Sequence, residues 1–393
     1  SKVSRGLGDV YKRQVSSSPV PVDVLSAEDI SKTGTDDLLM QLQGSIPSLN
    51  VHLQPISDAA SMIRPANLRG LSADSTLITT NGKRRHHASV IAFQGGGVND
   101  GSQGADISVI PAIALKRVEV LRDGASAQYG SDAIAGVINF VLDDISEGGS
   151  LSYKMGEYTE GDGATSTIAG KYGMPLGQDG FVTTSFQIRQ ADDTSRSAQR
   201  PDAAALIAAG NAAVANPAQI WGAPKIDDDV TFFMNSGVTN SDGSESYMFG
   251  NYSERDVDGG FYYRNPDGRS GVFTIGDYRA VGNVDGTCAY GTGASGQVDP
   301  SNYATRDAIM ADPSCFLMNE IAPGGYTPRF VGTITDTSFT TGRRGEITDG
   351  FLSGYSFDVS GSVGRNEADF GLNNTVNPSM GPDTPRNFIT GSY

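Results

Sequence analysis

The chain has 393 residues, and its 29 lysines and arginines against 45 aspartates and glutamates give a net charge of −16. A surface this acidic repels phosphate backbones, which disfavours nucleic-acid binding. The 50 glycines and a charged fraction of 19% disfavour a helical bundle and favour short strands joined by turns. No apolar run reaches the roughly 18 residues of a spanning helix, although the strands of a membrane barrel need no such run.

The first ordered elements are expected just after the N-terminal residues. Residues 1–18 match no pattern around them, lack the apolar core of a secretory leader, and are expected to lie outside the native fold. Alternating valines in residues 20–24 predict a short strand, and a capping-box pattern at Ser26–Asp29 predicts a helix after it. Thr35 is the expected cap of a second helix. The buried face of that helix is predicted to comprise Leu38, Leu39, Leu42 and Ile46.

Further along, the pattern predicts a small sheet. Residues 77–84 form a hairpin whose Asn81-Gly82 turn favours positive φ at both central positions. Residues 117–120 predict a strand with valines on one face and charges on the other, and residues 136–142 predict a mostly apolar, buried strand. Residues 19–143 are therefore expected to form a small α+β domain.

The remainder, residues 149–393, has the pattern of a barrel wall. Polar and apolar side chains alternate along several segments, such as residues 182–189 and 355–363. Residues 191–229 and 256–337 are long and irregular, and long loops on one side with short turns on the other are typical of outer-membrane barrels. A soluble β-sandwich also alternates, but loops of this length are uncommon in compact soluble domains.

We count about seven strands, each near the roughly 9–11 residues that cross a membrane. Single-chain bacterial barrels have even strand numbers from about 8 upward, so an incomplete barrel is expected. Residues 387–393 are aromatic but do not alternate cleanly, which makes them a weak candidate for a closing strand.

The two cysteines, Cys288 and Cys315, allow two interpretations. They are either unpaired thiols or one disulfide, which in the chain-entropy model contributes roughly 3–4 kcal/mol for a loop of this size. The disulfide is favoured and requires an oxidising compartment. A zinc site is not expected, because no cluster of ligands accompanies the cysteines.

The segment from Ile110 to Phe140, IPAIALKRVEVLRDGASAQYGSDAIAGVINF, identifies a family. It resembles the plug-domain signature of TonB-dependent outer-membrane receptors, and residues 46–51, 67–70 and 77–83 resemble further plug segments in the right order. The resemblance implies an α+β plug domain followed by an antiparallel transmembrane β-barrel, here incomplete. It also implies a bacterial outer-membrane location and no cofactor.

The resemblance assigns roles to individual residues of the plug. Asp123-Gly124 and Tyr129-Gly130 allow tight turns that a β-carbon would strain, and the charged residues of the signature are expected to face solvent or a polar lumen. The residues expected to define the plug and to contact the barrel are Arg69, Gly70, Arg117, Glu119, Arg122, Gly124, Tyr129, Gly130, Gly136 and Asn139.

In this family, the plug loops nearest the outside help to bind the ligand. Lys83–His87 forms a basic patch in an acidic chain, which attracts anionic ligands or equally serves as a solubilising loop tip. Aromatic residues in the expected outer loops (Trp221, Tyr262, Tyr263, Tyr290 and Tyr326) suit stacking on a ligand or a membrane girdle. The predicted ligand-binding residues are Gln54, Ser72, Asp74, Arg85, His86, His87, Gln94 and Asn99.

Signals for catalysis are weak throughout. Residues 291–296 match a dinucleotide-binding pattern literally, but no strand leads into them and no helix follows. Asp227–Asp229 lacks calcium-loop spacing and is expected to be a solvated loop. With three histidines in no catalytic or metal arrangement, neither an enzyme nor a metal site is expected.

The function implied by the resemblance is TonB-dependent uptake of a scarce solute: a siderophore, a vitamin, haem or an oligosaccharide. The implied partners are TonB, the solute and outer-membrane lipid, although no TonB-contacting box is evident before Pro19. The alternatives are a secreted β-rich binding or adhesion protein with an α+β head, and a secreted carbohydrate-active enzyme. Fractionation with outer membranes would indicate the receptor, secretion into the medium the binding or adhesion protein, and polysaccharide turnover the enzyme.

Overall fold

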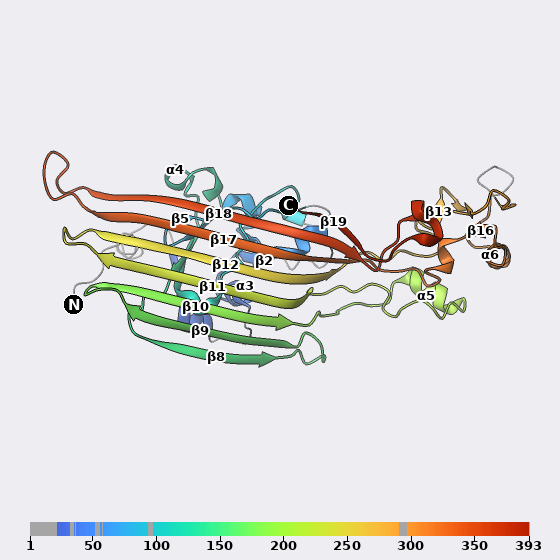
Figure 1. The fold of residues 1–393 in the computed structure, drawn as a ribbon, viewed down its shortest axis with the longest axis horizontal. Helices are drawn as coiled ribbons and strands as arrows, with labels where there is room; N and C mark the ends of the chain where they lie inside the picture. The colour runs from blue at the N-terminus through green and yellow to red at the C-terminus, as the bar shows by residue number, and fades with distance from the viewer. Residues whose placement is uncertain are drawn as a thin grey trace.

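The chain folds into a small mixed domain that packs against one face of a large curved sheet, in a computed structural model (Figure 1). The structure describes residues 22–31, 35, 37–51, 56, 58–92, 97–290 and 297–392. We call the small domain the plug and the large sheet the wall. None of the helices that the structure describes is long and apolar enough to cross a membrane.

The plug is built on a five-stranded mixed sheet. Its strands lie in the spatial order β1–β6–β7–β4–β5, with β4 and β7 parallel and the other pairs antiparallel. The strands are β1 (Val22–Ser26), β4 (Thr76–Thr80), β5 (Lys83–Arg84), β6 (Leu115–Leu121) and β7 (Gly136–Leu142). A separate small pair is formed by β2 (Leu49–Val51) and β3 (Ala66–Leu68).

Three short helices belong to the plug: α2 (Ala27–Ser31), α3 (Leu38–Ser45) and α4 (Ser126–Tyr129). The predicted capping box forms, because the Asp29 N–H donates to Ser26 Oγ at 3.1 Å and the Ser26 N–H donates to Asp29 Oδ2 at 3.3 Å. The prediction of Thr35 as the cap of α3 was wrong. Asp37 is the N-cap, and its carboxylate accepts from two backbone N–H groups of the first turn.

One glycine is essential to the plug sheet. Gly136 begins β7 with φ of 147°, and a β-carbon there would lie 2.1 Å from the Leu121 carbonyl oxygen and 2.7 Å from Leu68 Cδ2. No side chain fits without separating β6 from β7. The hairpin turn also has the predicted geometry, with φ of 48° at Asn81 and 76° at Gly82.

The wall is an antiparallel sheet in which each strand pairs with its neighbour in sequence. Seven of its strands have nine or more residues, and β8 and β19 are its edges. The strands are β8 (Gly148–Gly156), β9 (Thr165–Pro175), β10 (Gly180–Ala191), β11 (Lys225–Thr239), β12 (Glu245–Gly260), β17 (Arg329–Glu346), β18 (Ser356–Asn373) and β19 (Phe388–Ser392).

The alternation along the wall is reversed relative to a water-soluble protein. On β10, Thr183 and Ser185 are buried against the plug, whereas Phe186 and Ile188 are 38% and 44% exposed. The other exposed apolar side chains of the wall include Leu151, Tyr153, Met155, Ile168, Val230, Phe232, Tyr252, Phe339, Val359 and Val363. The convex face is therefore apolar, whereas the face toward the plug combines polar side chains with buried apolar ones such as Phe233, Phe249 and Ile334.

One prediction about the strands was wrong. The expected loops at 191–229 and 256–337 are shorter, because β11 begins at Lys225, β12 continues to Gly260 and β17 begins at Arg329. The strands continue through charged and Gly-rich segments, because backbone pairing does not depend on the side chain. The polar side chains of these segments face the plug or lie at the water-exposed ends of the strands. Phe388–Ser392 also pairs with β18, despite its lack of alternation.

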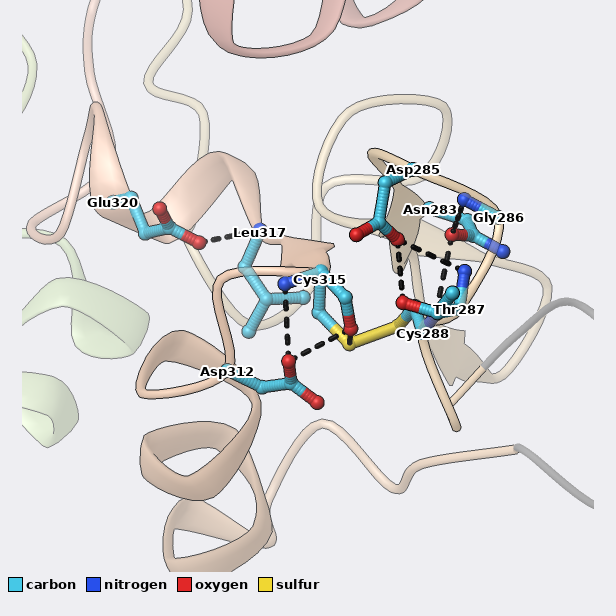
Figure 2. Close-up of a disulfide and its surroundings, with 10 residues drawn as sticks. Asn283, Asp285, Gly286, Thr287, Cys288, Asp312, Cys315, Leu317 and Glu320 are labelled. Carbon is cyan, nitrogen blue, oxygen red and sulfur yellow. Dashed lines mark hydrogen bonds between the residues drawn. A yellow bond between two sulfur atoms is a disulfide. The ribbon is translucent and has the colours of Figure 1, made fainter.

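The connection from β12 to β17 is the longest, and it forms a compact segment beyond the wall (Figure 1). It contains α6 (Tyr303–Met310) and the short strands β13 (Thr274–Ile275), β14 (Tyr278–Arg279), β15 (Gly282–Asn283) and β16 (Cys315–Phe316). A disulfide joins Cys288 to Cys315 across a separation of 27 residues (Figure 2). The connection from β10 to β11 carries α5 (Pro201–Ala208) beside it. We call this side of the wall its loop end and the opposite side, with the short hairpins, its turn end.

We expect Gly136→Ala to destabilise the plug sheet by about 2–4 kcal/mol, because backbone strain and overpacking each cost about 1–3 kcal/mol. Gly44→Ala is the matched control. Gly44 lies inside α3 with no atom within 4 Å of an added β-carbon, so the change should stabilise the helix by about 0.5–1 kcal/mol. Hydrogen exchange of the β6, β7 and α3 amides, in the chain held in detergent, measures both. Similar effects of the two changes would contradict the role of Gly136.

Candidate functional site

The contact surface between plug and wall is the most highly organised polar region of the described chain. Directly after β5, the chain turns Arg85 and His86 toward the wall, while the Arg85 N–H still bonds to the Ile78 carbonyl at 3.0 Å. The Asn81 side chain of the turn donates to Asn235 Oδ1 on β11 at 3.2 Å. The hairpin therefore projects a row of polar groups onto the wall.

The central contact is made by Asp336 of β17, whose side chain is 2% exposed. Arg85 pairs with one carboxylate oxygen at 2.5 Å, and His86 Nε2 lies 2.8 Å from the other. Asn251 of β12 and Asn366 of β18 donate to the same carboxylate at 2.9 and 3.0 Å. We call these five residues the Asp336 hub.

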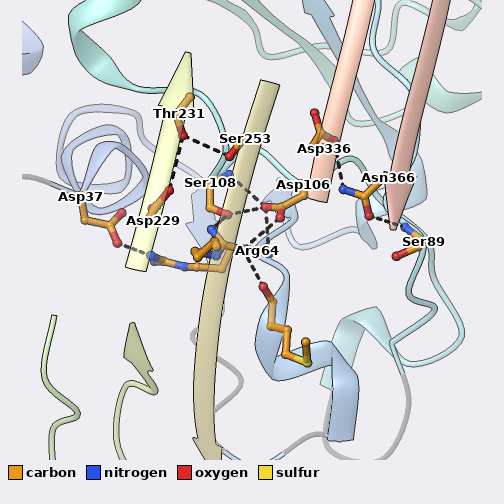
Figure 3. Close-up of polar contacts among 12 residues, drawn as sticks. Asp37, Arg64, Ser89, Asp106, Ser108, Asp229, Thr231, Ser253, Asp336 and Asn366 are labelled. Carbon is orange, nitrogen blue, oxygen red and sulfur yellow. Dashed lines mark hydrogen bonds and ion pairs between the residues drawn. The ribbon is translucent and has the colours of Figure 1, made fainter. Parts of the chain in front are cut away.

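The wall is shaped to receive the hub. A β-carbon at Gly364 would lie 2.2 Å from His86 Nδ1, so only glycine at this position leaves room for the imidazole ring. Asn366 also accepts from the Ser89 N–H at 2.7 Å, which fixes the plug backbone beyond His86 (Figure 3). The donors to the Asp336 carboxylate thus come from both the plug and the wall.

A second buried ion pair links Arg255 of β12 to Asp106 of the plug at 3.1 Å (Figure 3). The Asp106 side chain is 0% exposed and the Arg255 side chain 4%. Arg255 also donates to the Met62 carbonyl at 2.6 Å and to Ser108 Oγ. The other oxygen of Asp106 accepts from the Ser108 hydroxyl at 2.6 Å and from the Arg64 N–H at 3.2 Å. These contacts join two plug segments, residues 62–64 and 106–108, to one strand.

A third set lies nearer the turn end. Lys83 pairs with Asp358 of β18 at 2.9 Å, and the Tyr247 hydroxyl donates to the same residue at 2.6 Å. Burial alone would lower the pKa of Lys83, but hydrogen bonds to Asp358 and Tyr247 outweigh burial and raise it. On the other flank, Lys171 of β9 pairs with Asp143, where the plug ends.

Arg64 and Asp37 form an ion pair inside the plug that faces β10 (Figure 3). Burial by itself raises the pKa of the Asp37 carboxyl. The charges of Arg64 and Arg189, together with hydrogen bonds to the carboxylate, outweigh burial, so the pKa lies below its ordinary value of 3.8. A small cavity beside this pair is lined by Asp229 of β11, which is 4% exposed. Asp227 and Asp228 are exposed, as predicted for solvated charges, but the prediction of a loop was wrong, because Asp227–Asp229 belongs to the paired strand β11 and Asp229 is buried.

Comparison with known proteins adds the family. Residues 14–137 match the family model described as TonB-dependent Receptor Plug Domain. This part of the chain is a TonB-dependent receptor plug. A ferric enterobactin receptor of Pseudomonas aeruginosa is 32% identical over 120 residues, which are 30% of this chain and 16% of that protein. A probable TonB-dependent siderophore receptor PirA of Acinetobacter baumannii is 29% identical over 120 residues, again 30% and 16%.

Solved structures also match over a longer stretch of the chain, at lower sequence identity. A mutant of the ferric enterobactin receptor PfeA from Pseudomonas aeruginosa matches at 15% identity and a TM-score of 0.49, covering 92% of this chain and 47% of that one. The siderophore receptor PirA from Acinetobacter baumannii matches at 15% identity and a TM-score of 0.47, covering 91% and 45%. The chain spans less than half the length of these receptors.

The signature residues of the TonB-dependent receptor plug hold the plug together. Glu119 is 4% exposed, pairs with Arg117 at 2.7 Å and accepts from Asn139 at 2.9 Å. Asn139 accepts in turn from the Gly82 N–H at 2.8 Å and the Thr79 hydroxyl at 2.9 Å. These bonds tie β6, β7 and the hairpin to one another, and contact of Arg117, Glu119 and Asn139 with the barrel stays a prediction.

The remaining signature residues also make contacts within the plug. Arg122 pairs with Asp23 of β1 at 2.5 Å, and Arg69 lies 3.7 Å from Asp123. Arg84 donates to the Tyr129 carbonyl at 2.8 Å and pairs with Asp132. Positive φ values are found at Gly70 (72°) and Gly130 (97°), and the Gly124 N–H bonds to the Asp123 side chain at 2.8 Å.

The described residues of the predicted ligand-binding set differ in their surroundings. Asn99 is 0% exposed and exchanges two hydrogen bonds with Asn67, at 2.6 and 2.9 Å, so this prediction is corrected to a structural role. Arg85 and His86 are engaged with the wall in the Asp336 hub. Among the described residues of the set, Ser72 is partly exposed and Asp74 and His87 are exposed; Gln54 and Gln94 lie outside the described residues.

Sequence reasoning missed the wall residues of the site. Asp336 fell in a segment interpreted as a loop, because Thr333, Thr335 and Thr337 give its outward face no apolar alternation. One signal was available. Asp336 and Ile334 are two residues apart on a strand, so their side chains point to the same, inward face. A carboxylate buried on that face needs a cation as a partner, which the plug can supply.

We expect Asp336→Asn to weaken docking of the hairpin by about 3–5 kcal/mol, because it leaves the buried Arg85 guanidinium without a counter-charge. Hydrogen exchange of the β4–β5 amides, in the chain held in detergent, measures the loss. Asp144→Asn is the control, since Asp144 pairs with Lys116 in an exposed bridge that contributes about 0–1 kcal/mol. Equal protection in both variants would show that Asp336 does not anchor the plug.

The Asp37 charge should stabilise the plug in a pH-dependent manner. Since its folded pKa lies below the unfolded value, the contribution is complete above the unfolded value and is lost as pH falls through the folded one. Asp37→Asn keeps a good helix cap but removes the charge, so its deficit should be constant above about pH 5 and shrink in acid. Asp37→Ala should retain a further deficit of about 1 kcal/mol at every pH. Exchange of the α3 amides against pH measures both, and a pH-independent deficit for Asp37→Asn would contradict the assignment.

Proposed function

We propose that a receptor containing this chain takes up an iron–siderophore chelate across the bacterial outer membrane, with energy delivered by TonB. The observation that carries the proposal is a TonB-dependent receptor plug docked through buried ion pairs on the concave face of a barrel-like wall. Relatives of the plug include a protein named as a ferric enterobactin receptor and one named as a probable siderophore receptor, which favours an iron chelate over other solutes.

The convex face of the wall supports a membrane location. Its exposed apolar side chains include Leu151 and Met155, each 74% exposed, and Val359, 71% exposed. A continuous apolar band of this kind is stable against lipid and unfavourable in water. The water-soluble sandwich considered from the sequence would bury these side chains and expose the polar face instead.

The chemistry of the plug–wall contacts suits a part that must move. Buried ion pairs contribute little net stability relative to apolar packing, yet they demand one geometry, because an unpaired buried charge is expensive. The Asp336 and Asp106 contacts therefore fix one docked position, beside two apolar clusters that the plug shares with the wall. When TonB pulls on the chain that precedes β1, water entering the seam can solvate the separated charges, and the plug can shift.

The activity is thus conformational gating and requires no bond-making residue. The named relatives are receptors for transport. In the proposed cycle, a chelate bound at the loop end is followed by a TonB-driven shift of the plug and passage along the polar concave face.

Uptake of radioactive iron tests the proposal. We expect a Gram-negative host without siderophore receptors of its own to gain uptake of ferric enterobactin when it expresses the complete receptor. Uptake should disappear in the same host without TonB, because the docked plug closes the lumen. Iron uptake that persists without TonB, or TonB-dependent uptake of a vitamin, haem or an oligosaccharide but of no iron chelate, would overturn the assignment.

A further inference from the structure

The turn between β17 and β18 carries large apolar side chains that are exposed. Residues 347–355 form this turn, which we call the turn-end tip, and it reaches beyond the neighbouring turns of the wall (Figure 1). Phe351 is 97% exposed, Tyr355 is 65% exposed and Leu352 is 46% exposed. Exposed apolar groups of this size mark a surface that contacts a partner.

The backbone at the base of the tip is hydrogen-bonded within the tip itself. The Ile347 N–H donates to the Tyr355 carbonyl and the Gly354 N–H donates to the Ile347 carbonyl, each at 2.8 Å. The Ser353 hydroxyl donates to the Thr348 carbonyl at 2.9 Å. In lipid, backbone N–H and C=O groups have no water to bind, so a segment that satisfies them internally suits an apolar environment.

The outward face of the wall shows where its apolar band ends on the loop side. On β10 the outward apolar residues end at Ile188, which is followed by Gln190. Strand register carries Ile188 across β11, β12 and β17 to Glu367 of β18. On β18 the outward apolar residues end at Val363, four positions nearer the turn end, from 367 to 363. The edge of the band therefore crosses the strands diagonally, which is expected when strands tilt by about 35–45° against a membrane.

The same displacement places the edge of the band on the turn side. β10 begins at Gly180, and strand register carries this residue to Val359 of β18. Four positions nearer the turn end, from 359 to 355, lies Tyr355. A membrane surface that meets the first residue of β10 therefore meets β18 at the base of the tip.

The height of the apolar band leads to the same level. From Val363 to Val359 a strand rises roughly 14 Å at about 3.4 Å per residue, which a tilt of about 40° reduces to roughly 10 Å across the membrane. From Val363 to Tyr355 the corresponding height is roughly 21 Å. The apolar band of outer-membrane barrels is about 25 Å tall. β18 therefore crosses such a band only if side chains of the tip complete it.

We propose that the turn-end tip is inserted into the periplasmic leaflet of the outer membrane, with Phe351 packed against phospholipid acyl chains. The short turns of outer-membrane barrels face the periplasm, which identifies the leaflet. Tyr355, Val359 and Val363 form one exposed apolar stripe, so the tip continues the lipid-facing side of the wall. Asp349, the one charged residue of the tip, then lies at the level of the headgroups. This inference rests on the membrane location proposed above and adds the level at which the hairpin meets the bilayer.

Spin labels on single introduced cysteines test the inference in the complete receptor, reconstituted in phosphatidylcholine vesicles. Cys288 and Cys315 form a disulfide and take no label. Oxygen concentrates in lipid, whereas a water-soluble nickel complex is excluded from it, so the ratio of the two collision rates reports the surroundings of the label. We expect a label at Leu352→Cys to collide mainly with oxygen. Adding Phe351→Asp should raise the collisions with nickel severalfold, because a charge against acyl chains is unfavourable.

Two further positions calibrate the measurement. Val363→Cys is the lipid control, because this side chain lies on the convex face and is 66% exposed. Ser241→Cys is the matched turn control, since it lies in the exposed polar turn between β11 and β12 at the same end of the wall. Nickel access at Leu352→Cys as high as at Ser241→Cys would overturn the inference and leave Phe351 as a contact for a periplasmic protein. Unchanged access after Phe351→Asp would overturn it as well.

Failure of the inference is distinguishable from failure of the proposals on which it rests. Lipid-type access at Val363→Cys with water-type access at Leu352→Cys rejects insertion of the tip and keeps the membrane location of the wall. Water-type access at both positions rejects the membrane location and the inference with it. Lipid-type access at both positions, in a receptor without TonB-dependent iron uptake, rejects the transport function and keeps the inserted tip.

Discussion

The buried charge of Asp336 is the constraint on which the arrangement of plug and wall depends. A carboxylate that is 2% exposed is tolerated only with a counter-charge and filled hydrogen-bond positions, and the plug supplies the charge through Arg85. The wall supplies the remaining donors from the two neighbouring strands. The plug can satisfy this carboxylate only with its hairpin at one height and one angle, so the hub sets the docked position.

The plug meets that requirement because its own structure is rigid where the hairpin begins. Asn139 joins the turn to the central strand, and Glu119 and Arg117 extend the same chain of bonds across the sheet. Gly136 brings β6 and β7 together closely enough for these bonds to form. The signature residues of the plug therefore hold the hairpin in position, and the hairpin in turn places charged side chains against the wall.

The loop end is organised separately from the plug. Its core is fixed by the Cys288–Cys315 disulfide and by Arg279, whose buried side chain pairs with Asp267 and bonds to Asn319. Under the transport function proposed above, this separation would divide ligand binding at the loop end from movement of the plug.

The sequence by itself determined the plug almost completely, since its capping box, its Asn-Gly hairpin and its glycine-dependent signature are local patterns that each dictate a backbone conformation. It also determined the alternating wall, and it left the thiols of Cys288 and Cys315 with two interpretations that the structure resolves as a disulfide. Only the tertiary structure decided which charges meet. Arg85 and Asp336 are separated by 250 intervening residues of chain, and the face that each presents depends on strand register, because a shift of one residue turns every side chain to the opposite face. Asn99 was misjudged for the same reason, because its partner Asn67 belongs to a different segment of the plug.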